Sequence, residues 1–364
     1  MTPVEAELRR LIAADGPQPV ARLMALANAH YYATCDPFGA AGDFVTAPEI
    51  SQIFGELVGL WAAAVWQAMG APDPVLLVEL GPGRGTLMAD ALRAAKVVPA
   101  FRRAAQVHLV ETSPTLRDLQ AKTLGSSGVA PAWHADLSAL PEGPTIVIAN
   151  EFFDALPIHQ FVAAADGWRE RVVGLGADGA LAFGLSPPLP IPPAAAGRAD
   201  GGSLVEVSFA ARRVMQDLAQ RLTAQGGAAL VIDYGYAAGG GDTLQALRSH
   251  RFADPLADPG EADLTAHVDF GALARAAKAA GATVHGPVSQ RDFLLALGIE
   301  IRAALLAKAR GADPATIAAA AARLVDPAPT GMGTLFKAMA VTDPSLPPPP
   351  AFGTIAAGSE PPAP

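Results

Sequence analysis

The stretch VELGPGRGTL, residues 78–87, follows an apolar run and brings Gly81, Gly83 and Gly85 close together. A glycine-rich turn that leaves a strand lets the backbone approach a ligand, because no Cβ atom intervenes. The helix that follows would offer unpaired N–H groups at its start. The stretch therefore predicts a ligand platform. A dinucleotide fingerprint requires a further glycine where Thr86 stands, so NAD is not the favoured ligand.

Short apolar runs alternate with helical stretches, which is the pattern of a mostly parallel sheet covered by helices. Residues 86–95 are interpreted as a crossover helix, and residues 272–286 as a helix that ends at Gly281 and is followed by a strand. The runs interpreted as buried strands are 75–80, 107–111, 145–150 and 228–235. The sequence thus predicts an α/β fold.

Three regions exceed a minimal α/β unit. Residues 31–51 are irregular and long for a connection, which makes them a lid candidate. A hairpin-like pair of runs and a Pro- and Ala-rich loop at 186–202 form a second region, and an Ala-rich helical insert forms the third. The predicted division is 1–70 for the N-terminal helices and lid, 71–160 for the first half of the core, 161–205 for the inserted hairpin and loop, 206–289 for the second half of the core, 290–330 for the helical insert, 331–342 for the last core strand and 343–364 for a disordered tail.

Composition limits the class of protein. Hydrophobic residues make up 51% of the chain and charged residues 17%, which indicates a globular chain rather than a disordered one. No uninterrupted apolar stretch reaches the roughly 18 residues of a membrane span, so none is predicted. The net charge of −9 and the lack of a dense basic run disfavour nucleic acid as a partner.

Cys35 is the only cysteine, which excludes an intrachain disulfide and a cysteine-based zinc cluster. We expect no metal site. Residues 1–16 carry Glu5 and Glu7 within a helical pattern and lack an apolar core followed by a cleavage site, so no export or organelle signal is expected. These observations predict a reducing, cytoplasmic location, in a bacterium.

Polar residues mark the carboxyl ends of the predicted strands. Glu111 ends the second strand, where a carboxylate can accept both hydroxyls of a ribose, and Asp136 follows a third strand within reach of an adenine edge. Glu79, just ahead of the glycines, is placed to meet a cationic amine. Each feature alone has a plainer explanation, a tight turn or a surface carboxylate, but their order and spacing favour a nucleoside-sized cleft.

Four motifs carry a resemblance to the class I S-adenosylmethionine-dependent methyltransferases: VELGPGRGTL, LVETSPTL (109–116), HADL (134–137) and ANEFFDALP (149–157). More narrowly, the chain resembles the MidA-like family, which includes a mitochondrial complex I assembly factor that acts as a protein arginine methyltransferase. Further matching stretches are 31–59, 231–235, 242–250, 262–270, 293–299 and 332–341.

The resemblance implies a Rossmann-like, seven-stranded sheet with an N-terminal helical lid and inserted substrate-recognition elements. The implied cofactor is S-adenosyl-L-methionine, with Glu79 near its methionine portion. The implied activity is symmetric ω-N dimethylation of arginine in a complex I subunit, in bacteria the equivalent NADH dehydrogenase subunit. The residues implied to hold the cofactor are Gly81, Gly83, Gly85, Glu111, Asp136, Leu137 and Asn150.

The loop after the fourth strand indicates the target. Amine methyltransferases acting on bases often carry Asn/Asp-Pro-Pro-aromatic here, whereas this chain has Asn150, Glu151, Phe152 and Phe153, followed by Asp154. A guanidinium stays charged, and carboxylates can grip it bidentately and draw its charge to one side. Glu151 and Asp154 are therefore the catalytic candidates. The two phenylalanines either wall the pocket or pack over the sheet.

Further candidates have two interpretations each. His267 is either a proton acceptor or an ordinary loop residue, and Asp269 either borders the cleft or caps the next helix. Asp233 and Tyr234, at the end of the fifth strand, either contact substrate or order the loop. The lid candidates are Tyr31, Tyr32, Asp43, Thr46 and Glu49. Glu49 has a second interpretation, as a residue that starts the helix with Pro48 at its first position.

Three functions stay open at this point. The first is a protein arginine methyltransferase, which the acidic loop and the acidic overall balance favour. The second retains the cofactor but methylates an amine-bearing small molecule; the large inserts favour a protein-sized partner instead. The third is a non-catalytic assembly factor that binds the cofactor, which the intact glycine platform and Glu111 disfavour.

Overall fold

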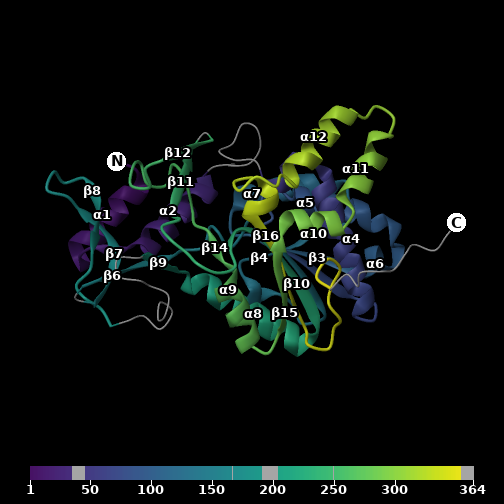
Figure 1. Ribbon diagram of the computed structural model, residues 1–364, viewed down its shortest axis with the longest axis horizontal. Coiled ribbons are helices and arrows are strands. Elements are labelled where there is room, and N and C mark those ends of the chain that lie inside the picture. The colour runs from purple at the N-terminus through teal and green to yellow at the C-terminus, as the bar shows by residue number, and fades with distance from the viewer. Residues whose placement is uncertain (35–45, 166, 191–203, 249, 354–364) are drawn as a thin grey trace.

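The computed structural model describes residues 1–34, 46–165, 167–190, 204–248 and 250–353. Asp43 and most of the loop at 186–202 lie outside the described residues. Figure 1 shows a large sheet between layers of helices and, at the other end of the long axis, a smaller sheet beside the N-terminal helices. Among the helices of the described residues, none has the length and apolar character needed to cross a membrane.

The large sheet confirms the α/β prediction. Seven of its strands follow one path, in the order β15-β16-β10-β5-β2-β3-β4, and the short β14 pairs with β10, so the sheet has eight strands. β16 is antiparallel to both neighbours, and the other pairings are parallel. The strands are β2 (Val75–Leu80), β3 (Ala105–Val110), β4 (Ala132–His134), β5 (Thr145–Asn150), β10 (Gly227–Tyr236), β14 (Val268–Asp269), β15 (Thr283–Ser289) and β16 (Phe336–Thr342).

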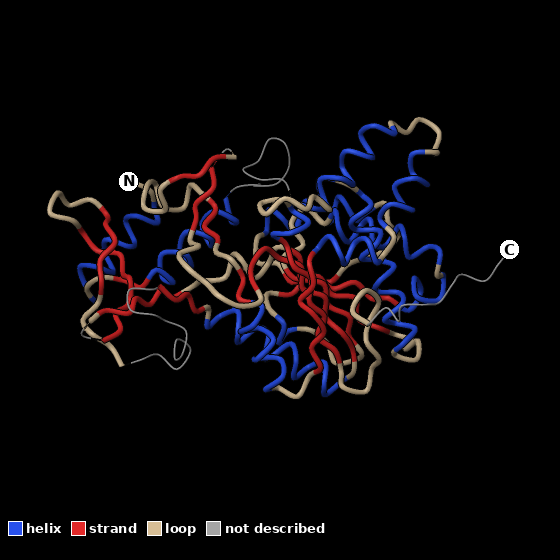
Figure 2. The backbone as a smooth tube through the Cα atoms, in the orientation of Figure 1, coloured by secondary structure: helices blue, strands red, loops and turns tan. Residues whose placement is uncertain are grey.

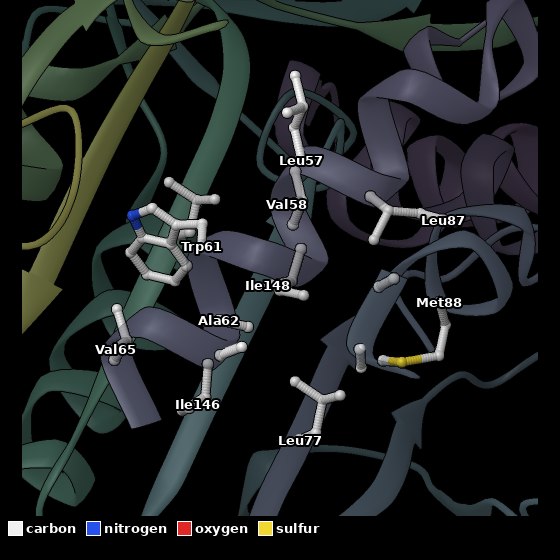
Figure 3. Packing of buried hydrophobic residues seen from close by; sticks show 14 of the residues in the cluster. Leu57, Val58, Trp61, Ala62, Val65, Leu77, Leu87, Met88, Ile146 and Ile148 are labelled. Atoms are coloured by element: carbon white, nitrogen blue, oxygen red, sulfur yellow. The ribbon is translucent and has the colours of Figure 1, made fainter. Parts of the chain in front are cut away.

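Both faces of this sheet are covered, which explains why its central strands are apolar throughout. Alternate residues of β5 face opposite layers: Ile146 and Ile148 belong to one core cluster, and Val147 and Ala149 to another. Figure 3 shows the first cluster, in which α4 and α5 pack on β2 and β5. The covering helices are α4 (Gln52–Ala68), α5 (Thr86–Ala94), α6 (Pro99–Ala104) and α7 (Pro114–Gly125), and on the other side α8 (Phe209–Gln225) and α9 (Phe270–Ala279).

Two smaller sheets stand outside the core (Figure 2). In the five-stranded sheet, β7 and β8 form the hairpin predicted within residues 161–205. The other sheet has three strands in the order β12-β11-β13. The strands are β1 (Gln18–Pro19), β6 (His159–Ala164), β7 (Gly167–Leu175), β8 (Leu181–Leu185) and β9 (Leu204–Val207) in the first sheet, and β11 (Gln245–Arg248), β12 (Arg251–Ala253) and β13 (Asp263–Thr265) in the second.

The N-terminal helices pack against the smaller sheets, and the helical insert packs against the large one. Residues 343–353 differ from the disordered tail expected for 343–364: Phe352 packs on the main core, with its ring 5.6 Å from that of Phe293. Residues 354–364 lie outside the described residues. The remaining helices are α1 (Pro3–Asp15), α2 (Val20–Thr34), α3 (Ala47–Ile50), α10 (Gln290–Ala296), α11 (Ile299–Ala307), α12 (Pro314–Leu324) and α13 (Met332–Leu335).

The close contact between α4 and α5 generates a prediction about Gly59. A Cβ atom at this position would lie 2.5 Å from Cα of Ala91, which is backbone and cannot rotate away. We expect Gly59→Ala to lower the free energy of unfolding by about 1–3 kcal/mol, as measured by urea denaturation. Gly125→Ala is the control, because a Cβ there meets nothing within 4 Å. Equal effects of both substitutions would contradict this packing.

Candidate active site

A cleft of about 1590 Å³ opens at the carboxyl ends of β2, β3, β4 and β5. Parallel strands end at the same edge of a sheet, so the loops that follow them converge there. Helix α2 and the three-stranded sheet supply the opposite wall. Predicted site residues that line the cleft are Tyr32, Gly81, Gly83, Glu111, Asp136, Leu137, Glu151, Phe152, Asp154, Tyr234 and His267.

The glycine loop needs glycine for its backbone conformation. Gly81, Gly83 and Gly85 have φ angles of +59°, +52° and +81°, in the left-handed region that other residues rarely adopt. Gly81 and Gly83 line the cleft, whereas Gly85 precedes the first residue of α5 and lies against Gln120. A Cβ on Gly81 would also meet the Phe152 ring at 3.0 Å. The loop thus presents bare backbone to the cleft.

Glu111 is held by its neighbours with its carboxylate at the cleft. Its Oε1 accepts hydrogen bonds from the backbone N–H groups of Thr112 and Ser113, both at 2.8 Å. Gln120 Nε2 donates both to Glu111 Oε2, at 3.1 Å, and to the carbonyl oxygen of Gly83, at 2.7 Å. Gln120 therefore ties the carboxylate to the glycine loop. Sequence reasoning missed it, because a lone glutamine on a helix carries no motif.

Asp136 and Leu137 lie on the neighbouring loop. Asp136 Oδ1 accepts from the Ser138 hydroxyl at 2.6 Å and from the backbone N–H groups of Ser138 and Ala139. These bonds, the Ser138 hydroxyl first, hold the pKa of Asp136 below its usual value. The carboxylate is thus charged and fixed at the rim of the cleft.

Glu79 does not line the cleft, and its expected place near the methionine portion of the cofactor stays a prediction. It is buried behind the glycine loop, and burial raises its pKa to about 8 although the backbone N–H of Met88 donates to it. Its Oε2 has no hydrogen-bond partner among the described residues. Position 79 shares a face of β2 with Leu77, which packs in the core cluster formed with α4 and α5.

Four carboxylates gather at the end of the cleft farther from Glu111, and we name Glu151, Asp154, Asp233 and Asp263 the acid cluster. Repulsion from other members of the cluster adds to burial in raising the pKa values of Glu151 and Asp233, whereas burial alone raises that of Asp154. Asp263 faces the same space from β13 and repels Glu151. The part of the chain that the structure describes holds no set of three or more His, Cys, Asp or Glu residues arranged for a metal ion.

Glu151 is strained and half-buried. Its φ angle of +51° is uncommon for a residue with a side chain, and such outliers cluster at functional sites. The backbone N–H of Ala47 and Asn150 Nδ2 donate to its Oε1, at 3.2 and 3.1 Å. Burial, reinforced by repulsion from Asp154, raises the pKa of Glu151 to about 8. Asn150 itself does not line the cleft, since its side chain is engaged with Glu151.

Asp154 retains an unused acceptor. Burial raises its pKa to about 6, and the Tyr234 hydroxyl hydrogen-bonds with it. Asp154 Oδ1 is buried without a hydrogen-bond partner among the described residues. A buried acceptor of this kind is costly unless a donor arrives, so the end of the cleft is suited to a ligand rich in N–H or O–H groups.

Asp233 and Phe153 have structural roles, which is one of the two interpretations that the sequence left open for each. Asp233 is fully buried, and its Oδ2 accepts from the backbone N–H groups of Phe152, Phe153 and Asp154 at 3.2, 2.9 and 3.3 Å. Phe153 packs into the core beneath α8, while Phe152 lines the cleft. The loop-ordering interpretation of Asp233 is therefore the one the geometry supports.

His267 lines the cleft and Asp269 does not. The His267 ring meets that of Tyr234 edge to face, with centroids 5.5 Å apart, and burial lowers its pKa, which favours the neutral imidazole. Its backbone N–H donates to Thr243 Oγ1 at 2.9 Å. Asp269 instead caps α9 by accepting from the Ala272 N–H at 2.8 Å, which is the plainer of its two interpretations.

Of the described lid candidates, Tyr32 lines the cleft, and the others are part of the surrounding structure. The Tyr32 hydroxyl donates to Asp263 Oδ1 at 2.8 Å, and burial keeps it protonated by raising its pKa. Tyr31 is buried in the interior and Thr46 is buried ahead of α3, so neither lines the cleft. Glu49 accepts from Thr86 Oγ1 at 2.5 Å and so holds the start of α5.

Asn28, which carries no motif, ties the two walls together. Its Nδ2 donates to the carbonyl oxygens of Ala155 and Leu264, at 2.9 and 2.7 Å, and its Oδ1 accepts from the Leu264 N–H at 3.1 Å. A single buried side chain on α2 thus bonds both to the loop after β5 and to β13. Asn28 lines the cleft as well.

The chain is similar to known methyltransferases over most of its length. Residues 57–288 match the model of a family of S-adenosyl-L-methionine-dependent methyltransferases, and the chain belongs to this family. It is 41% identical over 334 residues to the Mus musculus protein arginine methyltransferase NDUFAF7, mitochondrial, covering 84% of this chain and 76% of that protein. The Drosophila melanogaster homolog is 40% identical over 379 residues, covering 92% and 84%.

A solved structure agrees with this assignment. A COG1565 superfamily member from Burkholderia thailandensis, bound to S-adenosyl-homocysteine, superimposes with a TM-score of 0.80 at 30% identity, covering 96% of this chain and 94% of that one. S-adenosyl-L-methionine is therefore the cofactor. The described residues fit it: the glycine loop offers bare backbone, and the Glu111 and Asp136 carboxylates at the rim suit the hydroxyl and amine donors of a nucleoside.

The position of Gln120 leads to a prediction about cofactor affinity. Gln120→Leu removes the donor shared by Glu111 and Gly83 while keeping a similar volume. We expect the dissociation constant for S-adenosyl-L-methionine, measured by calorimetry, to rise about tenfold. Gln67→Leu on α4, which is exposed, should leave it unchanged. Unaltered affinity in the Gln120 variant would show that Glu111 needs no such support.

The raised pKa of Glu151 makes stability depend on pH. Near pH 4.5 Glu151 is largely protonated in the folded state, so its burial costs little free energy. As the pH rises toward 8, the carboxyl group ionises in the unfolded chain but not yet in the folded protein, and this difference lowers the free energy of unfolding. Glu151→Gln stays neutral throughout. Measured by urea denaturation, the variant should match wild type in acid and exceed it at about pH 9 by on the order of 4 kcal/mol. The exposed Glu142→Gln is the control. A difference in the free energy of unfolding between Glu151→Gln and wild type that does not grow with pH would contradict the burial of a charged group at this position.

Proposed function

We propose that this methyltransferase acts on the guanidinium group of an arginine in a protein substrate. The observation that carries the proposal is the acid cluster at the end of the cleft, with its unused buried acceptor on Asp154. A guanidinium brings N–H donors and a permanent positive charge, which the crowded carboxylates lack. The curated relatives named protein arginine methyltransferase support the same target.

In this proposal the two ends of the cleft have separate tasks. Gly81, Glu111 and Asp136 hold the cofactor, which supplies an electrophilic methyl group on its sulfonium. Glu151 and Asp154 bind the guanidinium and draw its positive charge toward themselves, so that electron density stays on the nitrogen that attacks. Phe152, which lies against Gly81 between the two ends, excludes water.

Methyl transfer to a guanidinium nitrogen releases one proton from that nitrogen, and the product stays cationic. His267 lines the cleft and burial keeps its imidazole neutral, so it is the proposed acceptor of this proton. Asp154 is the alternative acceptor, since its raised pKa of about 6 lets it hold a proton when no cation is bound. His267→Gln distinguishes them, because it lowers kcat only in the first case.

Several finer features belong to the proposal. The family resemblance supports symmetric ω-N dimethylation and a complex I subunit, or its bacterial NADH dehydrogenase equivalent, as substrate. A seven-stranded methyltransferase core is supported by the single path of seven strands. A lid formed by the N-terminal segment is supported by Tyr32 in the cleft wall and by the bond from Ala47 to Glu151. The cytoplasmic location stays a prediction.

The test is transfer of tritium from labelled S-adenosyl-L-methionine to lysate of cells lacking the protein, followed by amino-acid analysis of labelled bands. We expect label in dimethylarginine, lost by at least about a hundredfold in Glu151→Gln because its neutral amide cannot balance the cation. Glu142→Gln, which is exposed, should retain activity.

Activity should also respond to pH. Because a cation binds better to the ionised form of Glu151, KM for arginine substrates should fall as pH rises from about 6 to 9.

Label confined to small amines would instead support the small-molecule function. Cofactor binding without any transfer would support a non-catalytic assembly factor.

A further inference from the structure

The three-stranded sheet carries a row of side chains that leads into the acid cluster. Leu247 on β11 pairs directly with Phe252 on β12 and with Asp263 on β13. Residues directly opposite one another in antiparallel strands project from the same face. All three line the cleft, whereas Ala246 and Leu264, their neighbours in sequence, are buried in the core on the other face. The row therefore runs from the sheet edge to a carboxylate of the acid cluster.

The outer end of this row is an aromatic side chain left in water. Phe252 is 78% exposed, about twice as much as Phe183 at 39%. β12 is an edge strand, and Figures 1 and 2 show its sheet beside α2, above the large sheet. Together with Leu247, Phe252 extends an apolar surface from the sheet edge into the cleft, where a bound ligand can contact it. Phe252 adds nothing to the core that would explain it.

The spacing of the row fits an extended polypeptide. Neighbouring strands lie about 4.8 Å apart, so two strand spacings place Phe252 about 10 Å from Asp263. Three residues of extended chain cover the same distance, at about 3.3 Å per residue. A polypeptide whose arginine enters the acid cluster can therefore lay the side chain of a residue two or three positions away on Leu247 and Phe252.

We propose that Leu247 and Phe252 select substrate polypeptides that carry an apolar residue two or three positions from the methylated arginine. The inference rests on the proposed arginine methyltransferase function and adds a specificity determinant to it. The acid cluster recognises the guanidinium, which every arginine has. The apolar row distinguishes one arginine from another by the burial of a flanking side chain.

The test compares two labelled heptapeptides that have arginine at the third position and glycine elsewhere, except that the sixth position is leucine in one and serine in the other. Binding is followed by fluorescence anisotropy with the full chain saturated with S-adenosyl-homocysteine, and methyl transfer is measured separately with tritiated S-adenosyl-L-methionine. Wild type should bind the leucine peptide about fivefold more tightly, the gain expected from burying part of an apolar side chain.

Phe252→Ser should remove this preference and leave the affinity for the serine peptide unchanged. Ile301→Ser on α11 is the matched control, because Ile301 is also largely exposed, at 70%, and does not line the cleft. Melting temperatures of both variants should equal that of wild type, since neither side chain is part of the core.

Two results would overturn the proposal: no preference between the peptides in wild type, or a preference that persists in Phe252→Ser. The outcome for the arginine methyltransferase function is separate. If the leucine peptide binds preferentially but receives no methyl group, that function fails and the selective surface stands. If both peptides bind with equal affinity and both are methylated, the arginine methyltransferase function stands and the apolar row does not determine substrate specificity.

Discussion

Asp233, fully buried at the end of β10, accepts hydrogen bonds at a single carboxylate oxygen from three successive backbone N–H groups, those of Phe152, Phe153 and Asp154. Three consecutive amides can point at one acceptor in very few backbone conformations. The loop after β5 is thereby fixed with Glu151 at positive φ, a conformation that costs roughly 1–3 kcal/mol and persists only when the surroundings enforce it. The directions of Glu151 and Asp154, the two carboxylates proposed to bind substrate, follow from this one constraint.

The same constraint explains why carboxyl groups that disfavour one another's ionisation lie close together when no ligand is bound. Fixing the loop over Asp233 brings Glu151 and Asp154 close to a third buried carboxyl, and burial raises the pKa of all three. Part of the cluster therefore holds protons near neutral pH. A bound cation would allow these groups to ionise, so recognition of charge and release of protons are two aspects of one equilibrium.

The sequence predicted the parts of the site that depend on backbone chemistry. The glycines at 81 and 83, and the carboxylates that follow β3 and β5, are located by strand ends and turn composition, because parallel topology brings such positions together. Side-chain direction is harder to predict. Glu79 and Asp233 end or approach the ends of strands as Glu111 does, but they point into the interior, which depends on the pleat and on which helices cover each face.

Residues that act through long-range contacts were not predictable at all. Gln120 and Asn28 are single polar residues on helices. Gln120 bonds to Gly83, 37 residues away, and Asn28 bonds to Ala155, 127 residues away. No local pattern distinguishes them from solvated side chains. They are identified only once the fold shows that each is buried and that its amide group bonds to at least two separate segments of the chain.

The bonds made by Asn28 also constrain how the cleft can open. Because α2 is joined to the loop after β5 and to β13 through one amide group, moving any of these three segments relative to the others would break hydrogen bonds of a buried side chain. A hinge that widens the cleft would therefore lie outside these three segments and leave the arrangement of the acid cluster unchanged. Amide protons of α2 and of the loop after β5 should accordingly exchange with solvent in a single cooperative event.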